Sequence, residues 1–147
     1  RSDPGIRSIC EQVSEYTKIS LSQQETLHVL NYQSGDKNAM FHYDAFAGDI
    51  DHVRYMHGGQ RTHSFLVYLS DGCIGGGTYF PKYQNTKIEP EMGKAVYWSN
   101  TIGNEIDPLS YHAALPVEQG EKWSCAFFHR DVPAPIGQIW QRTVYNN

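Results

Sequence analysis

The chain has 147 residues, a length that favours a single domain, 1–147, with a real hydrophobic core. A net charge of −4 gives no basic footprint, so nucleic acid is not the expected partner. No apolar run approaches the length of a membrane span, and no such span is expected in this chain. Ten tyrosines, six phenylalanines and thirteen glycines suit short strands and turns, which predicts a mainly β fold.

An amphipathic helix is predicted near the start. Asp3 can cap free helix amides, and Pro4 is tolerated in the first turn. Apolar residues then recur at helical spacing, at Ile6, Ile9, Cys10 and Val13. The chain begins at Arg1 with neither an initiator Met nor a secretory leader, so we expect a processed or shortened piece.

Short β-rich segments follow, separated by glycine, proline and acidic turns. The predicted strands are 26–33, 40–46, 63–70, 77–81, 94–100, 110–117 and 122–130. Strands of this length and spacing predict a sandwich or barrel with its core at about 26–130. The "DGCIGGG" run at 71–77 is expected to be a hairpin loop. The tail after Asp131 is expected to pack outside through Ile139 and Trp140.

In "FHYDAF", His42 and Asp44 are two residues apart, so on a strand their side chains would share a face and could bind one ion. His112 lies in a later predicted strand that a barrel could bring alongside. Two imidazoles and one carboxylate form the facial triad of non-haem Fe(II) oxygenases, which leaves metal positions open for other ligands. The other histidines, His28, His52, His57, His63 and His129, are interpreted as surface or hydrogen-bonding residues.

Lys122 lies ten residues after His112, across the turn "VEQGE". If the two flanking strands pair, its ammonium returns toward the metal, where the distal carboxylate of 2-oxoglutarate would lie. A buried lysine needs such a partner to offset its desolvation.

With these residues in place, the chain resembles the catalytic domain of prolyl 4-hydroxylases, within the 2-oxoglutarate and Fe(II)-dependent dioxygenases. The resemblance runs from about Ile6 to Arg130, through "LNYQSG", "FHYDAF", "GGQRTHSFLVYLSD", "GGTYFP", "MGKAVYW" and "DPLSYHAALPVEQGEKWS". It implies a distorted double-stranded β-helix, of jelly-roll or cupin type, with flanking helices. The helices and strands that usually precede this region in the family are absent from the chain.

The resemblance also implies roles for individual residues. His42, Asp44 and His112 would bind Fe(II), and Lys122 would bind 2-oxoglutarate with help from the hydroxyls of Tyr32 and Thr78. Arg61 would line the substrate groove. The chain departs from the family pattern at Ala39, Gly77 and Phe128; Ala39 and Phe128 bear on how proline is bound.

The resemblance implies hydroxylation of prolyl residues at C4 in a peptide or protein, with 2-oxoglutarate and O₂ consumed and succinate and CO₂ released. Ascorbate would serve as reductant. Alternative substrates are free proline, lysyl residues or another small molecule. Two alternatives of another class are a non-catalytic module that binds proline-rich peptides and a zinc hydrolase or cupin-like metal store on the same ligands.

Three cysteines, Cys10, Cys73 and Cys125, are too few for a disulfide scaffold; free thiols are the default expectation, and one bridge remains an alternative. They leave the compartment open, and the family resemblance favours the endoplasmic reticulum lumen if the source is eukaryotic. The sequence makes no prediction of the oligomeric state.

Overall fold

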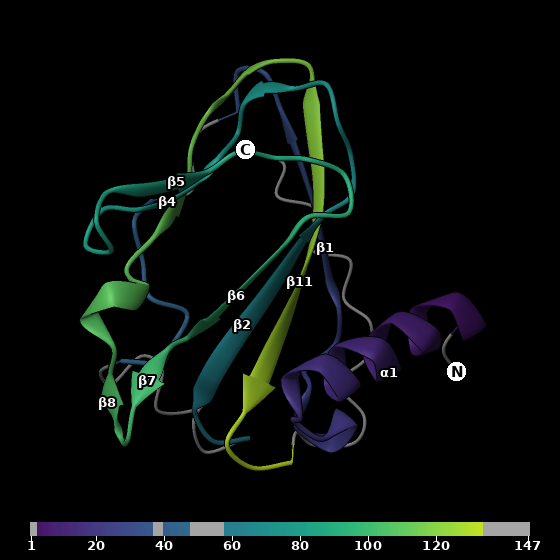
Figure 1. Cartoon of the computed structure of the whole chain (residues 1–147), viewed down its shortest axis with the longest axis vertical. Helices are drawn as coiled ribbons and strands as arrows, with labels where there is room; N and C mark the ends of the chain where they lie inside the picture. The colour runs from purple at the N-terminus through teal and green to yellow at the C-terminus, as the bar shows by residue number, and fades with distance from the viewer. Residues whose placement is uncertain (1–2, 37–39, 48–57, 134–147) are drawn as a thin grey trace.

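A computed structural model describes residues 3–36, 40–47 and 58–133. In Figure 1, a long sheet runs through the molecule, with the helix α1 on one side and the strands β4 and β5 on the other. None of the described helices has the length and apolar character needed to cross a membrane.

The helix α1 (Pro4–Thr17) forms where the sequence predicted it. The Asp3 carboxylate caps it by accepting hydrogen bonds from two amides of the first turn. Val13 is buried against the sheet, as the helical spacing predicted. Ile9 was expected on the same face, but 43% of it is exposed.

The main sheet is antiparallel, in the order β1-β11-β2-β6. These strands span His28–Gln33 (β1), Glu121–Arg130 (β11), Arg61–Tyr68 (β2) and Ala95–Ser99 (β6). Because side chains alternate along a strand, one face of the sheet receives α1 and the other faces the interior of the β core. The predicted strands at 26–33, 63–70, 94–100 and 122–130 are therefore confirmed, with small shifts at their ends.

Smaller antiparallel sheets complete the described fold, in the orders β5-β4-β9, β10-β3 and β7-β8. Their strands are Ile74–Gly75 (β3), Thr78–Phe80 (β4), Thr86–Ile88 (β5), Thr101–Ile102 (β7), Glu105–Ile106 (β8), Ala113–Ala114 (β9) and Val117–Gln119 (β10). Two 3-10 turns, Leu21–Gln23 (η1) and Pro108–Ser110 (η2), join these elements.

The main sheet has a hydrophobic cluster on each face. Between α1 and the sheet, the buried members are Val13, Phe65, Cys125 and Phe127. On the interior face they are Leu66, Tyr68 and Ala126, with Trp98 and Phe128 among the partly buried neighbours. A helix outside two facing β layers agrees with the expected double-stranded β-helix.

The segment 40–46 was predicted as a strand, and this prediction was wrong. Its only ladder contact among the described residues is a single bridge between His42 and His112. The backbone amide and carbonyl of Phe46 bind the side-chain amide of Gln60, at 2.7 and 2.9 Å. A side chain therefore takes the place that a neighbouring strand would have filled.

The segment 110–117 is not one strand either. It begins in the turn η2, which Asp107 caps through the amide of Leu109 at 2.9 Å. Pro116, which has no amide hydrogen, then separates β9 from β10. Part of the expected "DGCIGGG" loop is a strand, since β3 pairs with β10.

Predictions for Ala39, His52 and His57, and for tail packing through Ile139 and Trp140, lie outside the described residues. The three cysteines are free thiols. His129, predicted to be a surface or hydrogen-bonding residue, is fully buried, and its ring nitrogens have no partner in the described part of the chain.

Candidate metal centre and cosubstrate pocket

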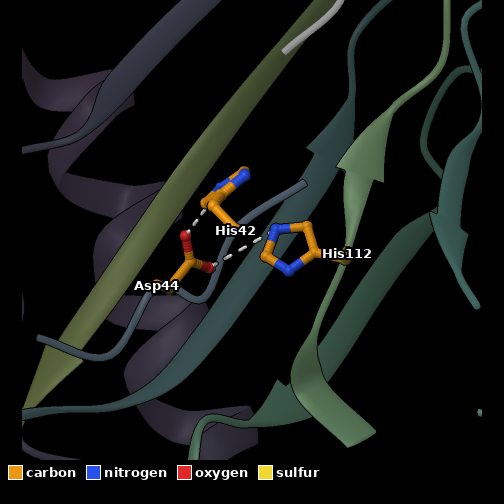
Figure 2. A group of neighbouring side chains, drawn as sticks. All are labelled: His42, Asp44 and His112. Carbon is orange, nitrogen blue, oxygen red and sulfur yellow. Dashed lines mark ion pairs between the residues drawn. The ribbon is translucent and has the colours of Figure 1, made fainter. Parts of the chain in front are cut away.

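The structure brings His42, Asp44 and His112 together (Figure 2). The carboxylate of Asp44 lies between the two imidazoles, with its Oδ1 3.4 Å from His42 Nε2 and its Oδ2 3.8 Å from His112 Nε2. One ligand atom from each residue falls within 4.8 Å of the others. Although the strand expected at 40–46 is absent, the three side chains still converge as predicted.

Backbone carbonyls orient both imidazoles. His42 Nδ1 lies 2.8 Å from the carbonyl of Met40, and His112 Nδ1 lies 2.8 Å from the carbonyl of Ser110. A carbonyl can only accept a hydrogen bond, so both Nδ1 atoms carry the proton. In the neutral rings this leaves both Nε2 lone pairs directed toward Asp44, as metal coordination requires.

The protonation tendencies of the three residues differ. The hydrogen bond with Asp44 raises the pKa of His42, whereas burial lowers the pKa of His112. Burial alone would raise the pKa of Asp44, but hydrogen bonds from His42 and Ser64 and the charge of His112 outweigh it and lower that pKa. The site therefore offers an ionised carboxylate and one imidazole that is readily neutral. A metal ion would displace a proton from the other imidazole, that of His42.

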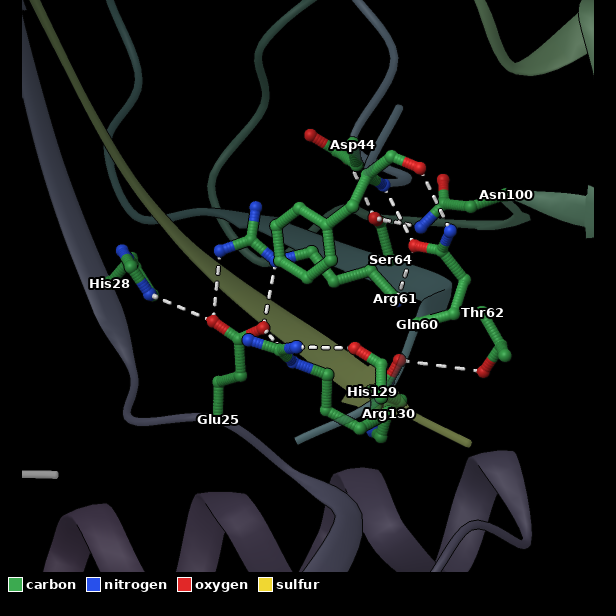
Figure 3. Close-up of polar contacts among 12 residues, drawn as sticks. Glu25, His28, Asp44, Gln60, Arg61, Thr62, Ser64, Asn100, His129 and Arg130 are labelled. Atoms are coloured by element: carbon green, nitrogen blue, oxygen red, sulfur yellow. Dashed lines mark hydrogen bonds and ion pairs between the residues drawn. The ribbon is translucent and has the colours of Figure 1, made fainter. Parts of the chain in front are cut away.

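A chain of buried hydrogen bonds holds the Asp44 carboxylate from behind (Figure 3). Ser64 Oγ donates to Asp44 Oδ2 at 2.6 Å, and Asn100 Nδ2 donates to Ser64 Oγ at 2.9 Å. Ser64 and Asn100 are fully buried. Such outer partners fix the direction of a metal ligand.

Aromatic rings fix the His112 imidazole. Phe80 stacks on it with ring centres 5.3 Å apart, and Trp98 meets it edge-on at 5.0 Å. Both rings also line a cavity of about 300 Å³ between β5 and β6. His112 itself is 6% exposed and therefore has little freedom to turn.

Lys122 is buried on the interior face of β11, with 2% of its surface exposed. The ammonium donates to the carbonyl of Gly76 at 2.8 Å and lies 4.2 Å from the centre of the Tyr32 ring. Burial lowers the pKa of Lys122 to about 8. No carboxylate from the described residues pairs with it, so an anionic ligand would offset its desolvation.

Lys122 does not reach this position by the route that the sequence suggested. The expected hairpin between the strands on either side of "VEQGE" does not form. Instead, β10 pairs with β3, and β11 pairs with β1 and β2. Lys122 is consequently the direct cross-strand partner of Tyr32.

Tyr32 and Thr78 lie at the same end of the interior as Lys122. The Tyr32 ring contacts the Lys122 ammonium directly. Thr78 lies two residues after Gly76, whose carbonyl accepts a hydrogen bond from that ammonium. Thr78 Oγ1 lies 2.7 Å from the hydroxyl of the fully buried Tyr68. The ammonium of Lys122 and the side chains of Tyr32, Tyr68 and Thr78 therefore gather polar groups at this end of the interior.

Arg61 makes no described contact with His42, Asp44 or His112, although its charge opposes protonation of His42. Its guanidinium binds both carboxylate oxygens of Glu25, at 2.7 and 2.8 Å, and lies over the Phe128 ring at 3.9 Å. Glu25 also binds Arg130, and Figure 3 shows the carboxylate between the two guanidinium groups. The substrate role of Arg61 stays a prediction.

Sequence reasoning missed three site residues: Ser64, Tyr68 and Asn100. For Ser64 and Tyr68 a signal was present, because strict alternation along β2 places both on the face of Leu66. Asn100 had no such signal, since it follows the end of β6.

Known proteins resemble this chain in sequence and in fold. Residues 27–130 match the family model described as the 2OG-Fe(II) oxygenase superfamily. The chain is 34% identical to probable prolyl 4-hydroxylase 3 of Arabidopsis thaliana, over 83% of this chain and 48% of that protein. It is 35% identical to prolyl 4-hydroxylase subunit alpha-1 of Rattus norvegicus, over 82% of this chain and 23% of that protein. The chain thus spans about half, or less, of these relatives.

Solved structures share the fold. The viral collagen prolyl hydroxylase of Paramecium bursaria Chlorella virus-1, in its 2OG complex, superposes with a TM-score of 0.65 at 25% identity, over 88% of this chain and 71% of that one. A Pseudomonas putida prolyl-4-hydroxylase gives a TM-score of 0.53 at 20% identity, over 85% of this chain and 62% of that one. The second likeness concerns the fold alone.

Proposed function

Because the chain belongs to the 2OG-Fe(II) oxygenase superfamily, we propose that it hydroxylates prolyl residues at C4 in a peptide or protein. In this reaction 2-oxoglutarate and O₂ are consumed, one oxygen atom enters the proline and the other enters succinate, and CO₂ is released. The names of the plant, rat and viral relatives support prolyl residues as substrates.

The observation that carries the proposal is the pairing of a metal-ready triad with a buried lysine. His42, Asp44 and His112 would hold Fe(II), which activates dioxygen and couples it to decarboxylation of 2-oxoglutarate. Three protein ligands leave positions for the cosubstrate and O₂. A zinc hydrolase or a metal store on the same triad would leave the buried ammonium of Lys122 without an ionic partner.

The protein's own groups would position the cosubstrate. Lys122 would bind its distal carboxylate, with hydroxyls from Thr78 and Tyr32 alongside. Ser64 would keep the Asp44 carboxylate turned toward the metal. Ascorbate would serve as the reductant that restores Fe(II).

The first experiment tests the metal site. His42→Ala, Asp44→Ala and His112→Ala should each abolish succinate release, while His63→Ala, a half-buried histidine outside the triad, should retain it. Anaerobic titration with Fe(II) and 2-oxoglutarate should give a weak visible charge-transfer band. Turnover that persists in all three triad variants would refute the assignment.

The second experiment tests the substrate. A proline-rich peptide, free proline and a lysine-containing peptide are each incubated with Fe(II), 2-oxoglutarate and ascorbate. Mass spectrometry should detect one added oxygen on the proline-rich peptide. Oxygen on free proline or lysine instead would assign a different substrate, and tight peptide binding without consumption of 2-oxoglutarate would indicate a binding module.

A further inference from the structure

Aromatic side chains gather on the protein surface beside the metal centre. The ring of Phe41 lies 5.5 Å from Tyr111 and 6.0 Å from Tyr79, and Tyr43 lies 4.9 Å from Tyr111. Lys82 donates to the Tyr43 hydroxyl at 2.9 Å, and its ammonium lies 4.8 Å from the centre of the Tyr111 ring. We call these five residues the aromatic platform.

The aromatic platform backs directly onto the metal ligands. His42 and His112 are joined by two backbone hydrogen bonds, of 2.9 and 3.0 Å. Neighbours in an extended chain point to opposite faces, so Phe41, Tyr43 and Tyr111 face away from the metal. The side chain of His42 is 44% exposed, so the metal centre is open to the surface near the aromatic platform.

The aromatic platform does not form part of the core. Phe41 is 44% exposed, Lys82 is exposed and the adjoining Met40 is 85% exposed. None belongs to either hydrophobic cluster of the main sheet. Tyr43, Tyr79 and Tyr111 are half-buried, so the aromatic platform is a partly exposed group of rings, which is a common mark of a binding surface.

The chemistry of the aromatic platform suits a proline-rich chain. A proline-rich segment offers carbonyl acceptors but few N–H donors, and it forms an extended helix with flat apolar faces. Aromatic surfaces with hydrogen-bond donors commonly recognise such segments. Here Lys82 and the hydroxyls of Tyr43 and Tyr111 supply donors, whereas the Tyr79 hydroxyl already donates to Asn85. Lys82 has no carboxylate partner in the described part of the chain.

We propose that the aromatic platform is a second contact site for the polypeptide substrate, binding a proline-rich stretch that lies outside the metal pocket. This inference rests on the proposed prolyl hydroxylase function. It assigns a preference for long over short peptides to Phe41, Tyr43, Tyr79, Lys82 and Tyr111.

The test compares a peptide with one proline against a proline-rich peptide of about ten residues, which spans about 30 Å when extended. The variants are Phe41→Ala and Lys82→Met. Tyr83→Ala is the matched control, because Tyr83 is 53% exposed and adjoins Lys82 but lies outside the aromatic platform. Each protein is loaded with Fe(II), its Fe(II) affinity is measured, and KM is determined for both peptides.

Each platform variant should raise the ratio of long-peptide KM to short-peptide KM at least about fivefold, the size expected for one lost aromatic or cationic contact. Tyr83→Ala should leave this ratio unchanged. An unchanged ratio in both platform variants would overturn the inference while leaving the hydroxylase function intact. A dimer that the platform variants disrupt, detected by sedimentation, would overturn it too, because a second copy of the chain would then occupy this surface.

Equilibrium binding of the long peptide without oxygen separates this inference from the proposed function. One outcome is that no peptide is hydroxylated, while the long peptide binds and the platform variants weaken that binding. This outcome would refute the proposed hydroxylase function and support the aromatic platform as a binding site. If the platform variants bind the long peptide as well as the unmodified protein does, the inference fails.

Discussion

The hydroxyl of Ser64 donates a 2.6 Å hydrogen bond to the Asp44 carboxylate, deep inside the β core. Because Asn100 holds the same hydroxyl, the direction of the carboxylate is set before any metal arrives.

Ser64→Ala should therefore weaken Fe(II) binding about 10- to 100-fold, the usual cost of losing such an outer partner. Ser99→Ala is the control, since it also removes one hydrogen-bonded hydroxyl, which donates to the carbonyl of Thr101 at 2.6 Å and not to a metal ligand. Anaerobic Fe(II) titration measures both variants. Equal affinities in the two would show that Ser64 does not position Asp44.

Gly76→Ala should raise the KM for 2-oxoglutarate several-fold. An added Cβ would lie 3.3 Å from Lys122 Cδ and 3.1 Å from Val117 Cγ2, so the lysine would have to shift. Gly72→Ala is a matched control, because Gly72 also has positive φ but has nothing within 4 Å of the new atom. If both variants change KM equally, backbone strain rather than crowding at Lys122 explains the effect.

The affinity for 2-oxoglutarate should fall above pH 8. Burial lowers the pKa of Lys122 to about 8. The side chain therefore carries its positive charge below this pH and loses it above. The KM for 2-oxoglutarate should then rise by up to about tenfold per pH unit. Lys122→Arg keeps its charge over this range and should show a flatter profile, whatever its absolute affinity. A parallel rise in both proteins would assign the titration to another group.

Stability should decline as the pH falls from about 6.5 toward 4. Burial and the charge of His63 lower the pKa of His129 to about 4, whereas an exposed histidine titrates near 6.5. The folded state thus keeps this ring neutral while the unfolded state takes up a proton, which destabilises the fold by up to about 3 kcal/mol. Denaturant unfolding across this range, compared with His129→Phe, measures the difference. The variant should show a shallower decline, and identical slopes would exclude His129 as the cause.

The residues that sequence reasoning located best are those in regular strands. Alternation and flanking turns indicated β1, β2, β6 and β11, and the α1 cap was visible in Asp3 and Pro4. The convergence of His42, Asp44 and His112 was also predictable, although the strand expected at 40–46 does not form. In 40–46 the side chain of Gln60 replaces a strand partner, and no local pattern reveals a bond between residues 14 positions apart.

Lys122 shows the same limit. The sequence indicated its burial, and its pairing with the 2-oxoglutarate carboxylate stays a prediction, but the strand pairing that places it depends on long-range register. For Arg61 the sequence suggested a substrate role, but it did not identify the partner. In the structure Arg61 binds Glu25, a residue that the sequence analysis had not singled out. Pairwise partners of this kind are set by the three-dimensional arrangement, which a linear pattern does not specify.

The bridge between His42 and His112 also bears on the stability of the folded protein. The two residues lie at either end of a stretch that includes β2 to β8, and in the described structure two backbone hydrogen bonds join them directly. A metal ion bound by both would stabilise the folded state, because the ligands come together only when the chain is folded. Removing the metal ion with a chelator should therefore lower the melting temperature. The ion that would support the chemistry would also hold together the two segments that carry His42 and His112.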